Sequence, residues 1–338
     1  HPVAHSFPTR RSSDLGTGTQ VADTESGNGQ LSVTLTGLTV GDTYYYIAYA
    51  TNEEGTSWGA QQSFTAAYNT PDGSGTEGDP YQIETIGQLD WLSRNSSEWD
   101  KYFIQMNDID ASVTTNWNGG DGFEPIGNLT DYFTGSYDGD NYSIDNLYID
   151  RSSEDYIGFF GVAYTANITN LGLTNVNITG KQYIGTIAGY PYSATITNCY
   201  STGNVYYGDN SAGGLVGYVF LGEINNCYSS CEIEWTEITN GTGVGGFASS
   251  INYATVTNCY SLGDVFGDNT VGGFIGSNSS STITNCYSAG NVSSYDTDYI
   301  GGLIGANFGG TVNNSFWDTE TSGQSSSAAG TGKTTAEM

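Results

Sequence analysis

The chain has 338 residues, of which 36 are acidic and only 7 are basic, and its formal net charge at pH 7 is −29. Binding to nucleic acids and to anionic membranes depends on basic residues that neutralise phosphates, so this charge excludes both as functions of the chain. The sequence also lacks an apolar run of the roughly 18 residues that a membrane-spanning helix needs, which excludes membrane insertion of this segment.

Residues 1–15 differ in character from the rest of the chain. The run from Ser6 to Leu15 resembles translated sequencing-adapter sequence and has no apolar segment of the kind found in secretory signals. We expect this tract to be non-native and the natural amino terminus to be missing. Both histidines, His1 and His5, lie within it, so neither is a candidate for catalysis or metal binding.

Residues 16–67 have the pattern of short β-strands. The run from Leu38 to Tyr44 leads into an alternating segment that continues to Ala50, and residues 52–55 predict a hairpin before a last strand that ends at Phe64. This order resembles the second half of a fibronectin type III domain, which implies a partial β-sandwich. Residues 68–79 are rich in Gly, Asp and Thr and predict a linker.

Residues 80–122 are expected to cap the domain that follows. Thr85 and Gln88 have the spacing of a capping box, and Ile86, Leu89 and Leu92 then fall on one face of a helix. A short amphipathic helix here would cover the open end of a repeat array, where strands otherwise offer unpaired backbone groups to other chains.

Residues 123–317 contain a repeat in which an aliphatic residue precedes an asparagine by two positions. Successive asparagines are separated by 24, 28, 28, 32, 27 and 29 residues, and a period of this length indicates a solenoid, a propeller or a repeat array. The repeats are too short for propeller blades and contain no helical segment that would suit a leucine-rich horseshoe. The asparagines are Asn146, Asn170, Asn198, Asn226, Asn258, Asn285 and Asn314.

A second column, of apolar residues in glycine-flanked runs, follows the same schedule. The distance from each run to the next aliphatic residue is constant, whereas the segment that precedes the run varies from 8 to 13 residues. Stacked coils need strands of fixed length and tolerate insertions at surface turns. The repeat therefore predicts an all-β fold, a parallel β-helix or β-solenoid of about seven coils. The column consists of Phe159, Ile187, Leu215, Phe247, Phe274 and Leu303.

The asparagines are expected to stack at a bend of each coil. Asn tolerates the left-handed backbone conformation that such a bend requires. Adjacent coils would lie about 4.8 Å apart, so the amides would hydrogen-bond from one coil to the next. A bend at Asn198 leaves Cys199 and Ser201 pointing inward and Tyr200 facing solvent.

The run from Gly213 to Gly217, followed by Asn226-Cys227-Tyr228-Ser229, resembles the repeat of the GLUG-motif family. Similar copies extend from about Gly185 to Trp317. The resemblance implies a scaffold more than a chemistry: these repeats occur in bacterial surface and secreted proteins, often adhesin-like, and beside the catalytic domains of some extracellular peptidases. Residues 318–338 predict a polar tail, where we expect the chain to be truncated.

The cysteines are expected to be buried free thiols. A ladder presents one thiol per coil in a line, whereas a metal site needs ligands that converge, so no metal centre is predicted. Cys231 stands where other coils have glycine, and a disulfide between Cys227 and Cys231 is the alternative. The four cysteines of the ladder are Cys199, Cys227, Cys259 and Cys286.

The variable segments hold the candidate binding residues. Acidic residues recur a few positions before the glycine pairs, and the longest segment adds a tryptophan beside carboxylates. These acids are either solvated turn residues or a carboxylate stripe that binds Ca²⁺ weakly, and the tryptophan either packs or contacts a sugar or peptide. The candidates are Asp209, Glu234, Trp235, Glu237, Asp268, Asp296 and Asp298.

Catalysis finds little support in the sequence. No Lys or Arg lies between Lys181 and Lys333, and no His-Glu-x-x-His zinc motif is present. We predict a non-catalytic segment of a bacterial extracellular or cell-surface protein, without a cofactor, that displays acidic and aromatic loops to a glycan, a cation or a protein on a host or neighbouring cell. The alternatives are a polysaccharide-active β-helix enzyme, which needs two close carboxyl groups, a peptidase's accessory scaffold, and a pure spacer.

Overall fold

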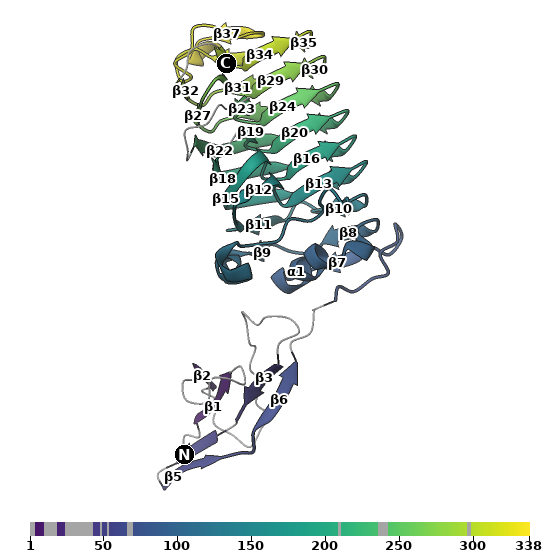
Figure 1. Ribbon diagram of the computed structural model, residues 1–338, viewed down its shortest axis with the longest axis vertical. Helices are drawn as coiled ribbons and strands as arrows, with labels where there is room; N and C mark the ends of the chain where they lie inside the picture. The colour runs from purple at the N-terminus through teal and green to yellow at the C-terminus, as the bar shows by residue number, and fades with distance from the viewer. Residues whose placement is uncertain are drawn as a thin grey trace. The chain divides into compact units, whose positions relative to one another are not determined.

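The computed structural model describes residues 4–9, 19–23, 43–47, 49–52, 54–65, 70–208, 211–235, 243–295 and 299–338 (Figure 1). The chain forms two compact units, His1–Asn69 and Thr70–Met338.

The first unit contains antiparallel strands. Its four-stranded sheet has the order β2-β1-β4-β5, and a second pair joins β3 to β6. Tyr44, the tyrosine of the fibronectin-like pattern, is buried and stacks on Phe64 with ring centroids 5.9 Å apart. The predicted hairpin is present, with Asn52 opposite Gly55. The strands are β1 (Ala4–Thr9), β2 (Thr19–Asp23), β3 (Thr43–Tyr46), β4 (Tyr49–Asn52), β5 (Gly55–Trp58) and β6 (Gln62–Thr65).

The second unit begins inside the segment that the sequence predicts to be a linker. The carbonyl of Asp72 accepts a hydrogen bond from the Gln82 amide at 2.8 Å, and the carbonyl of Gly75 accepts one from Tyr102 at 3.0 Å. Residues 70–79 are therefore folded onto the cap, because backbone pairing rather than composition decides where a linker ends.

The predicted capping helix is present as α1 (Ile86–Arg94). The Thr85 side chain accepts from the Gln88 amide, and the Gln88 side chain accepts from the Thr85 amide, so the capping box is complete. Leu89 and Leu92 are fully buried beneath it. The cap also contains the 3₁₀ helices η1 (Ser96–Glu98) and η2 (Ser112–Gly120) and the strand β9 (Ile109–Asp110).

The rest of the unit is a stack of short parallel strands that form three faces of a column (Figure 1). Face 1 is a six-stranded sheet of β13 (Phe160–Tyr164), β16 (Ala188–Tyr192), β20 (Val216–Phe220), β24 (Ala248–Asn252), β29 (Ile275–Ser279) and β34 (Ile304–Phe308). Face 2 has nine strands: β7 (Tyr81–Ile83), β8 (Tyr102–Gln105), β10 (Ser136–Asp138), β14 (Asn167–Thr169), β17 (Thr195–Thr197), β21 (Glu223–Asn225), β25 (Thr255–Thr257), β30 (Thr282–Thr284) and β35 (Thr311–Asn313).

Face 3 has sixteen strands and includes the variable segments. Besides β9 it contains β11 (Ser143–Asp145), β12 (Tyr148–Ile157), β15 (Gly172–Ile184), β18 (Tyr200–Tyr207), β19 (Ser211–Gly213), β22 (Tyr228–Trp235), β23 (Gly243–Gly245), β26 (Tyr260–Ser261), β27 (Val265–Gly267), β28 (Thr270–Gly272), β31 (Tyr287–Ser288), β32 (Val292–Ser294), β33 (Tyr299–Gly301), β36 (Phe316–Asp318) and β37 (Thr331–Lys333).

The predicted apolar columns form the core. The residues of the glycine-flanked column are all fully buried, and so are the aliphatic residues of face 2 from Ile168 to Ile283. Ile196 pairs with Ile168 and Ile224 in register, so like residues stack from coil to coil. The parallel β-solenoid predicted from the repeat is therefore confirmed.

Two bends that recur from coil to coil pass through the left-handed region. Asn170 and its five successors have φ between 43° and 56° where face 2 passes into face 3. A second bend, from face 1 into face 2, also has positive φ, and there it is occupied by residues as different as Leu221, at 58°, and Tyr253, at 53°. The second bend cannot be predicted from the sequence because no residue type recurs at this position.

Asn146 does not belong to the asparagine column. Asp145 pairs with Thr174, so Asn146 lies beside Asn175, at a different bend, and Gly139 occupies the place below Asn170. This explains the short first gap, and the column holds six asparagines rather than seven. Face 1 accordingly has six strands, so six coils carry all three faces, one fewer than predicted.

The segment 318–338, predicted to be a polar tail, packs on the last coil instead. Strand β37 pairs in parallel with β36, and Ser322 is fully buried. The Ser327 hydroxyl oxygen accepts from the amides of Leu303 and Ile304 at 3.3 and 2.8 Å. The small polar side chains of residues 318–338 thus form hydrogen bonds with backbone groups of the last coil that would otherwise lack partners.

Candidate functional site

The asparagine column is a coil-to-coil hydrogen-bond ladder. The side-chain amide of each asparagine donates to the carbonyl oxygen of the asparagine one coil earlier, at 3.0 to 3.5 Å, from Asn198 to Asn314. Asn170 ends the ladder by donating to Asp138 at 2.9 Å. The asparagine of the motif thus has a structural role.

The cysteine that follows points into the column. Cys199 and Cys227 are buried, and all five cysteines are free thiols, as predicted. The Cys227 sulfur accepts from the Cys199 amide at 3.3 Å. Burial, followed by hydrogen bonds to the neighbouring thiols, raises the pKa of Cys227, and burial raises the pKa of Cys231 to about 11. Cys227 and Cys231 are therefore protonated and unreactive at neutral pH.

The motif serine links two segments of the same coil by a hydrogen bond. Ser201 donates to the carbonyl of Gly214 at 2.9 Å, and Ser288 donates to Gly302 at 2.7 Å, across the interior. A Cβ at Gly214 would overlap both the Ser229 hydroxyl and the carbonyl of Gly246, so the glycine is required by close approach.

The motif tyrosine lies outside and stacks. Tyr200, Tyr228, Tyr260 and Tyr287 form one column with centroids 4.9 to 5.1 Å apart and rings within 8° of parallel. Phe316 continues the register of this column. All four residues of the Asn-Cys-Tyr-Ser motif are therefore used to build the column.

The variable segments leave face 3 at one shared edge. Strands β18, β22, β27 and β32 precede them and strands β19, β23, β28 and β33 follow them, and each set is paired strand to strand. Insertions are thus confined to the position that the repeat spacing predicts. Candidate residues Asp209, Glu237, Asp296 and Asp298 lie outside the described residues, as does the side chain of Trp235.

Two of the predicted candidates can be placed fully. Glu234 is exposed on β22, where its backbone is opposite Tyr206. Asp268 is half-buried in the turn between β27 and β28, and its carboxylate accepts from the Asn269 amide at 3.0 Å. Burial and the nearby Asp268 raise the pKa of Tyr207, which lies behind this turn.

The carboxyl groups with shifted pKa values do not resemble a general acid. Hydrogen bonds from Ser112 lower the pKa of Asp110. Burial opposes the shift at Asp318, but hydrogen bonds from Thr335 and from the backbone outweigh it and lower its pKa. Within the described ranges, no three His, Cys, Asp or Glu side chains are grouped to hold a metal ion.

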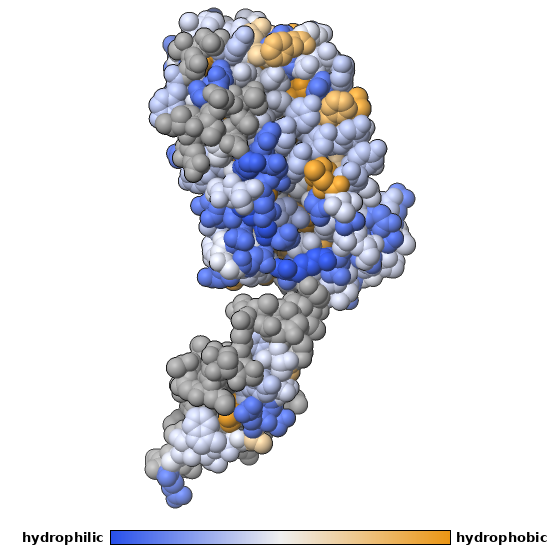
Figure 2. Space-filling view, in the orientation of Figure 1, coloured by the Kyte–Doolittle hydropathy of each residue, from blue (hydrophilic) through white to orange (hydrophobic). Residues whose placement is uncertain are grey.

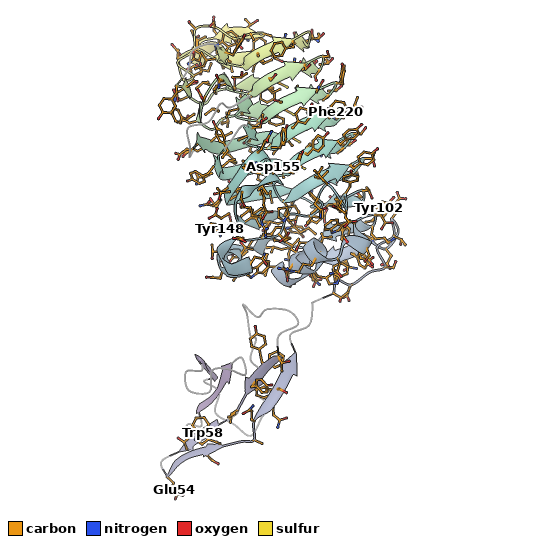
Figure 3. The ribbon with its side chains drawn as sticks, in the orientation of Figure 1. Glu54, Trp58, Tyr102, Tyr148, Asp155 and Phe220 are labelled. Carbon is orange, nitrogen blue, oxygen red and sulfur yellow. The ribbon has the colours of Figure 1, made fainter. Side chains whose placement is uncertain are left out.

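A surface that the sequence analysis missed lies on face 1. Tyr164, Tyr192 and Phe220 stack along three coils with centroids 5.0 and 5.2 Å apart, and Tyr190 and Tyr218 stack beside them at 5.5 Å. Figure 3 shows Phe220 where β20 ends. We call these five residues the aromatic patch. The signal in the sequence is an aromatic residue at alternate positions, in Tyr190-Pro191-Tyr192 and Tyr218-Val219-Phe220.

The visible surface of the column is otherwise mostly hydrophilic, with isolated hydrophobic groups on the side where the face 1 strands end (Figure 2). Leu221 and Phe308 are 46% and 59% exposed at the ends of β20 and β34. None of the helices among the described residues is long and apolar enough to span a membrane.

These features define a parallel β-solenoid repeat protein. Residues 267–293 match the family described as the GLUG motif, and the same residue pattern recurs in the neighbouring coils. The fibronectin-like part remains a resemblance.

Two curated proteins are similar to parts of the chain. Halomucin from Haloquadratum walsbyi is 41% identical over 145 residues, which is 41% of this chain and 2% of that protein. A putative Gly-rich membrane protein from Evansella cellulosilytica is 36% identical over 121 residues, 35% of this chain and 14% of that protein. The chain therefore spans a small part of the length of either relative.

Among solved structures, an IgA1 protease matches with a TM-score of 0.60 and 17% identity, over 94% of this chain and 26% of that one. At this identity the likeness shows the fold alone. The repeat, the fold and the relatives together indicate a structural repeat protein.

Proposed function

We propose that this chain is a rigid, non-catalytic segment of a secreted or cell-surface protein, which holds the variable edge of face 3 in contact with a partner. The observation that carries the proposal is that the motif residues and the variable segment of each coil have different roles. The motif asparagine and tyrosine make coil-to-coil contacts and the motif serine links two segments of one coil, while the variation in length lies at one edge.

The relatives support the surface location. Their names describe a mucin and a membrane protein, and both share more than a third of their residues with this chain where they align. The free thiols do not oppose it, because burial removes them from oxidants.

The contact residues of this proposal are those at the variable edge: Asp209, Glu234, Trp235, Glu237, Asp268, Asp296 and Asp298. Their carboxylates suit a cation such as Ca²⁺ or a basic protein surface, and Trp235 suits a sugar ring. A net charge of −29 favours cationic partners over anionic ones.

The test compares two charge-removing variants in the same coil. Glu234 and Glu223 are both exposed, but Glu234 lies beside the variable edge and Glu223 lies on face 2. Glu234→Gln combined with Trp235→Ala should weaken the binding of the full chain to Ca²⁺ in calorimetry, or to surface proteins of neighbouring cells, whereas Glu223→Gln should not. Equal effects of the two variants, or no binding by the wild type, would overturn the proposal.

A further inference from the structure

The aromatic patch is continuous over three coils of face 1. Its two columns contact each other, since Tyr190 and Tyr192 meet edge to face with centroids 6.1 Å apart and Tyr218 and Phe220 are 6.4 Å apart. Tyr156 and Tyr183 extend one column: they stack at 5.2 Å, and Tyr156 lies 5.6 Å from Tyr190.

The fold does not require these rings. Face 1 continues for three more coils, and in β24 and β29 the same outward positions hold small polar residues. Tyr218 is opposite Ser250 and Phe220 is opposite Asn252, and these in turn are opposite Ser277 and Ser279. Coils with and without rings keep the same strand length and register, so stacking alone does not account for the patch.

The patch is open to solvent on the outer side of the sheet. Tyr164 is 39% exposed and the other four members are half-buried. Clustered rings on the surface of a soluble protein are typical of binding sites, since aromatic side chains offer large contact area at low entropic cost. Strands β16 and β20 are paired on both sides, and β13, the edge strand of the sheet, forms bridges to Ile126 and Phe133 on its other side, so an extended peptide has no free edge to join there.

The charge around the patch selects among ligands. No Lys or Arg occurs from residue 182 to residue 332. The basic residues of the patch coils are Arg151, which pairs with Glu124 and Glu154, and Lys181, which is 3.8 Å from Asp155, so an anionic polymer would find little counter-charge there. The patch itself combines apolar ring surface with phenol hydroxyls. Burial and the neighbouring tyrosines raise the pKa of Tyr190 to about 12, so this hydroxyl remains a neutral hydrogen-bond donor at physiological pH.

We propose that the aromatic patch is a binding site for a neutral glycan. The C–H faces of a pyranose pack on aromatic surface and its hydroxyls exchange hydrogen bonds with phenols, which is the combination that this patch offers. The patch spans three strands, about 10 Å along the column axis, and so takes a short stretch of a polysaccharide rather than a single group. The proposal deepens the proposed function by naming a partner class, and rests on it only for an extracellular location.

The test uses the full chain and replaces rings by residues that the same register positions hold in later coils. Tyr190→Ser with Tyr218→Ser copies Ser250 and Ser277, so the coil should fold as before, which circular dichroism and thermal melting check. The probes are a panel of neutral polysaccharides (cellulose, mannan, unmodified β-glucan and starch) and anionic alginate, in affinity electrophoresis and calorimetry. Tyr102→Ser is the control, because Tyr102 is as exposed as Tyr164 of the patch but lies on face 2.

We expect at least one neutral polysaccharide to bind, with an affinity that falls by about tenfold or more in the double variant and is unchanged in Tyr102→Ser. Three results would each overturn the proposal: no neutral polysaccharide binds, the folded double variant binds as the wild type does, or alginate binds best. A wild-type dimer that the double variant abolishes, seen by sedimentation without glycan binding, would assign the patch to self-association instead.

The two proposals fail separately. Glu234→Gln with Trp235→Ala changes the edge of face 3 and should leave patch binding intact. If the patch binds no glycan while that variant still loses partner binding, the edge proposal stands and the patch proposal falls.

Discussion

The side-chain amide of Asn226 donates a hydrogen bond to Asn198, 3.3 Å away, although the two residues are 28 positions apart in the sequence. Asn226 in turn accepts from Asn258 at 3.2 Å. Because both residues also have positive φ, each asparagine combines two tasks, which are to bend its own coil and to bond to the next one.

Asn226→Ala and Asn226→Gly separate these tasks. Alanine loses two solvent-exposed side-chain hydrogen bonds and keeps a Cβ in the left-handed region without the polar side chain that lets asparagine adopt it, so we expect the free energy of unfolding to fall by about 2 kcal/mol. Glycine keeps the bend and loses only the amide, so we expect a loss of about 1 kcal/mol. Urea unfolding followed by circular dichroism measures both. Equal losses would mean that the bend carries no strain at this position.

Gly214→Ala should destabilise the solenoid far more than Gly208→Ala. A Cβ at Gly214 would overlap the backbone carbonyl of Gly246, whereas the nearest atom to a Cβ at Gly208 is the Gly180 carbonyl oxygen, at 3.9 Å. We expect a loss of about 3 kcal/mol or more in the first variant and a change within about 1 kcal/mol in the second. Thermal melting compares them, and similar melting temperatures would show that the coil can open at this point.

Cys231→Ala should flatten the dependence of stability on alkaline pH. The folded pKa of this thiol is about 11, above its ordinary value, because burial disfavours the thiolate. Because folding raises this pKa, the contribution of the protonated thiol to the free energy of unfolding is fully present below the unfolded pKa, about 8.5. That contribution is lost as the pH rises toward 11.

The free energy of unfolding of the wild type should therefore fall more steeply across this window, by up to about 1.4 kcal/mol per pH unit, than that of the variant. The difference between the two chains isolates the thiol from the tyrosines, which are common to both. Parallel curves would contradict the burial of Cys231.

Removal of residues 319–338 should weaken the last coil. Trp317 is 6% exposed, and its indole donates to the Gln324 carbonyl at 3.0 Å, so the truncation exposes the ring and leaves the N–H to water. We expect a loss of about 2 kcal/mol, with hydrogen exchange accelerated mainly in β34 and β36. Truncation of residues 334–338 alone is the control and should change far less. Unaltered exchange in β34 after the longer truncation would show that this segment is not a cap.

Much of the fold and of the candidate site could be predicted wherever the same residue type recurs at the same position of every coil. The recurring asparagine, glycine, cysteine and serine identify the column, its core and the edge where insertions occur, because coils in register place like residues in like surroundings. Asn146 shows the limit of this approach. It has the same left-handed preference as the others, and only strand pairing reveals that it serves another bend.

The position of the aromatic patch on the solenoid could not be predicted in the same way. Its rings lie two residues apart on one strand and 28 residues apart in each stacked pair, but whether they meet depends on which side of face 1 points outward. The sequence also contains many other tyrosines, and their separation into the Tyr200 column and the patch follows from the second bend, which no residue type marks.

The sequence by itself determined that this chain is a stack of parallel coils, with an interior that repeats from coil to coil and one variable edge. The reason is that the repeat spacing encodes the length of each strand and which side chains point inward. Only the tertiary structure decided the number of coils, the packing of residues 318–338 as a cap and the meeting of rings on face 1. These depend on contacts between coils and on backbone turns that several residue types can adopt, so no pattern of single residues records them.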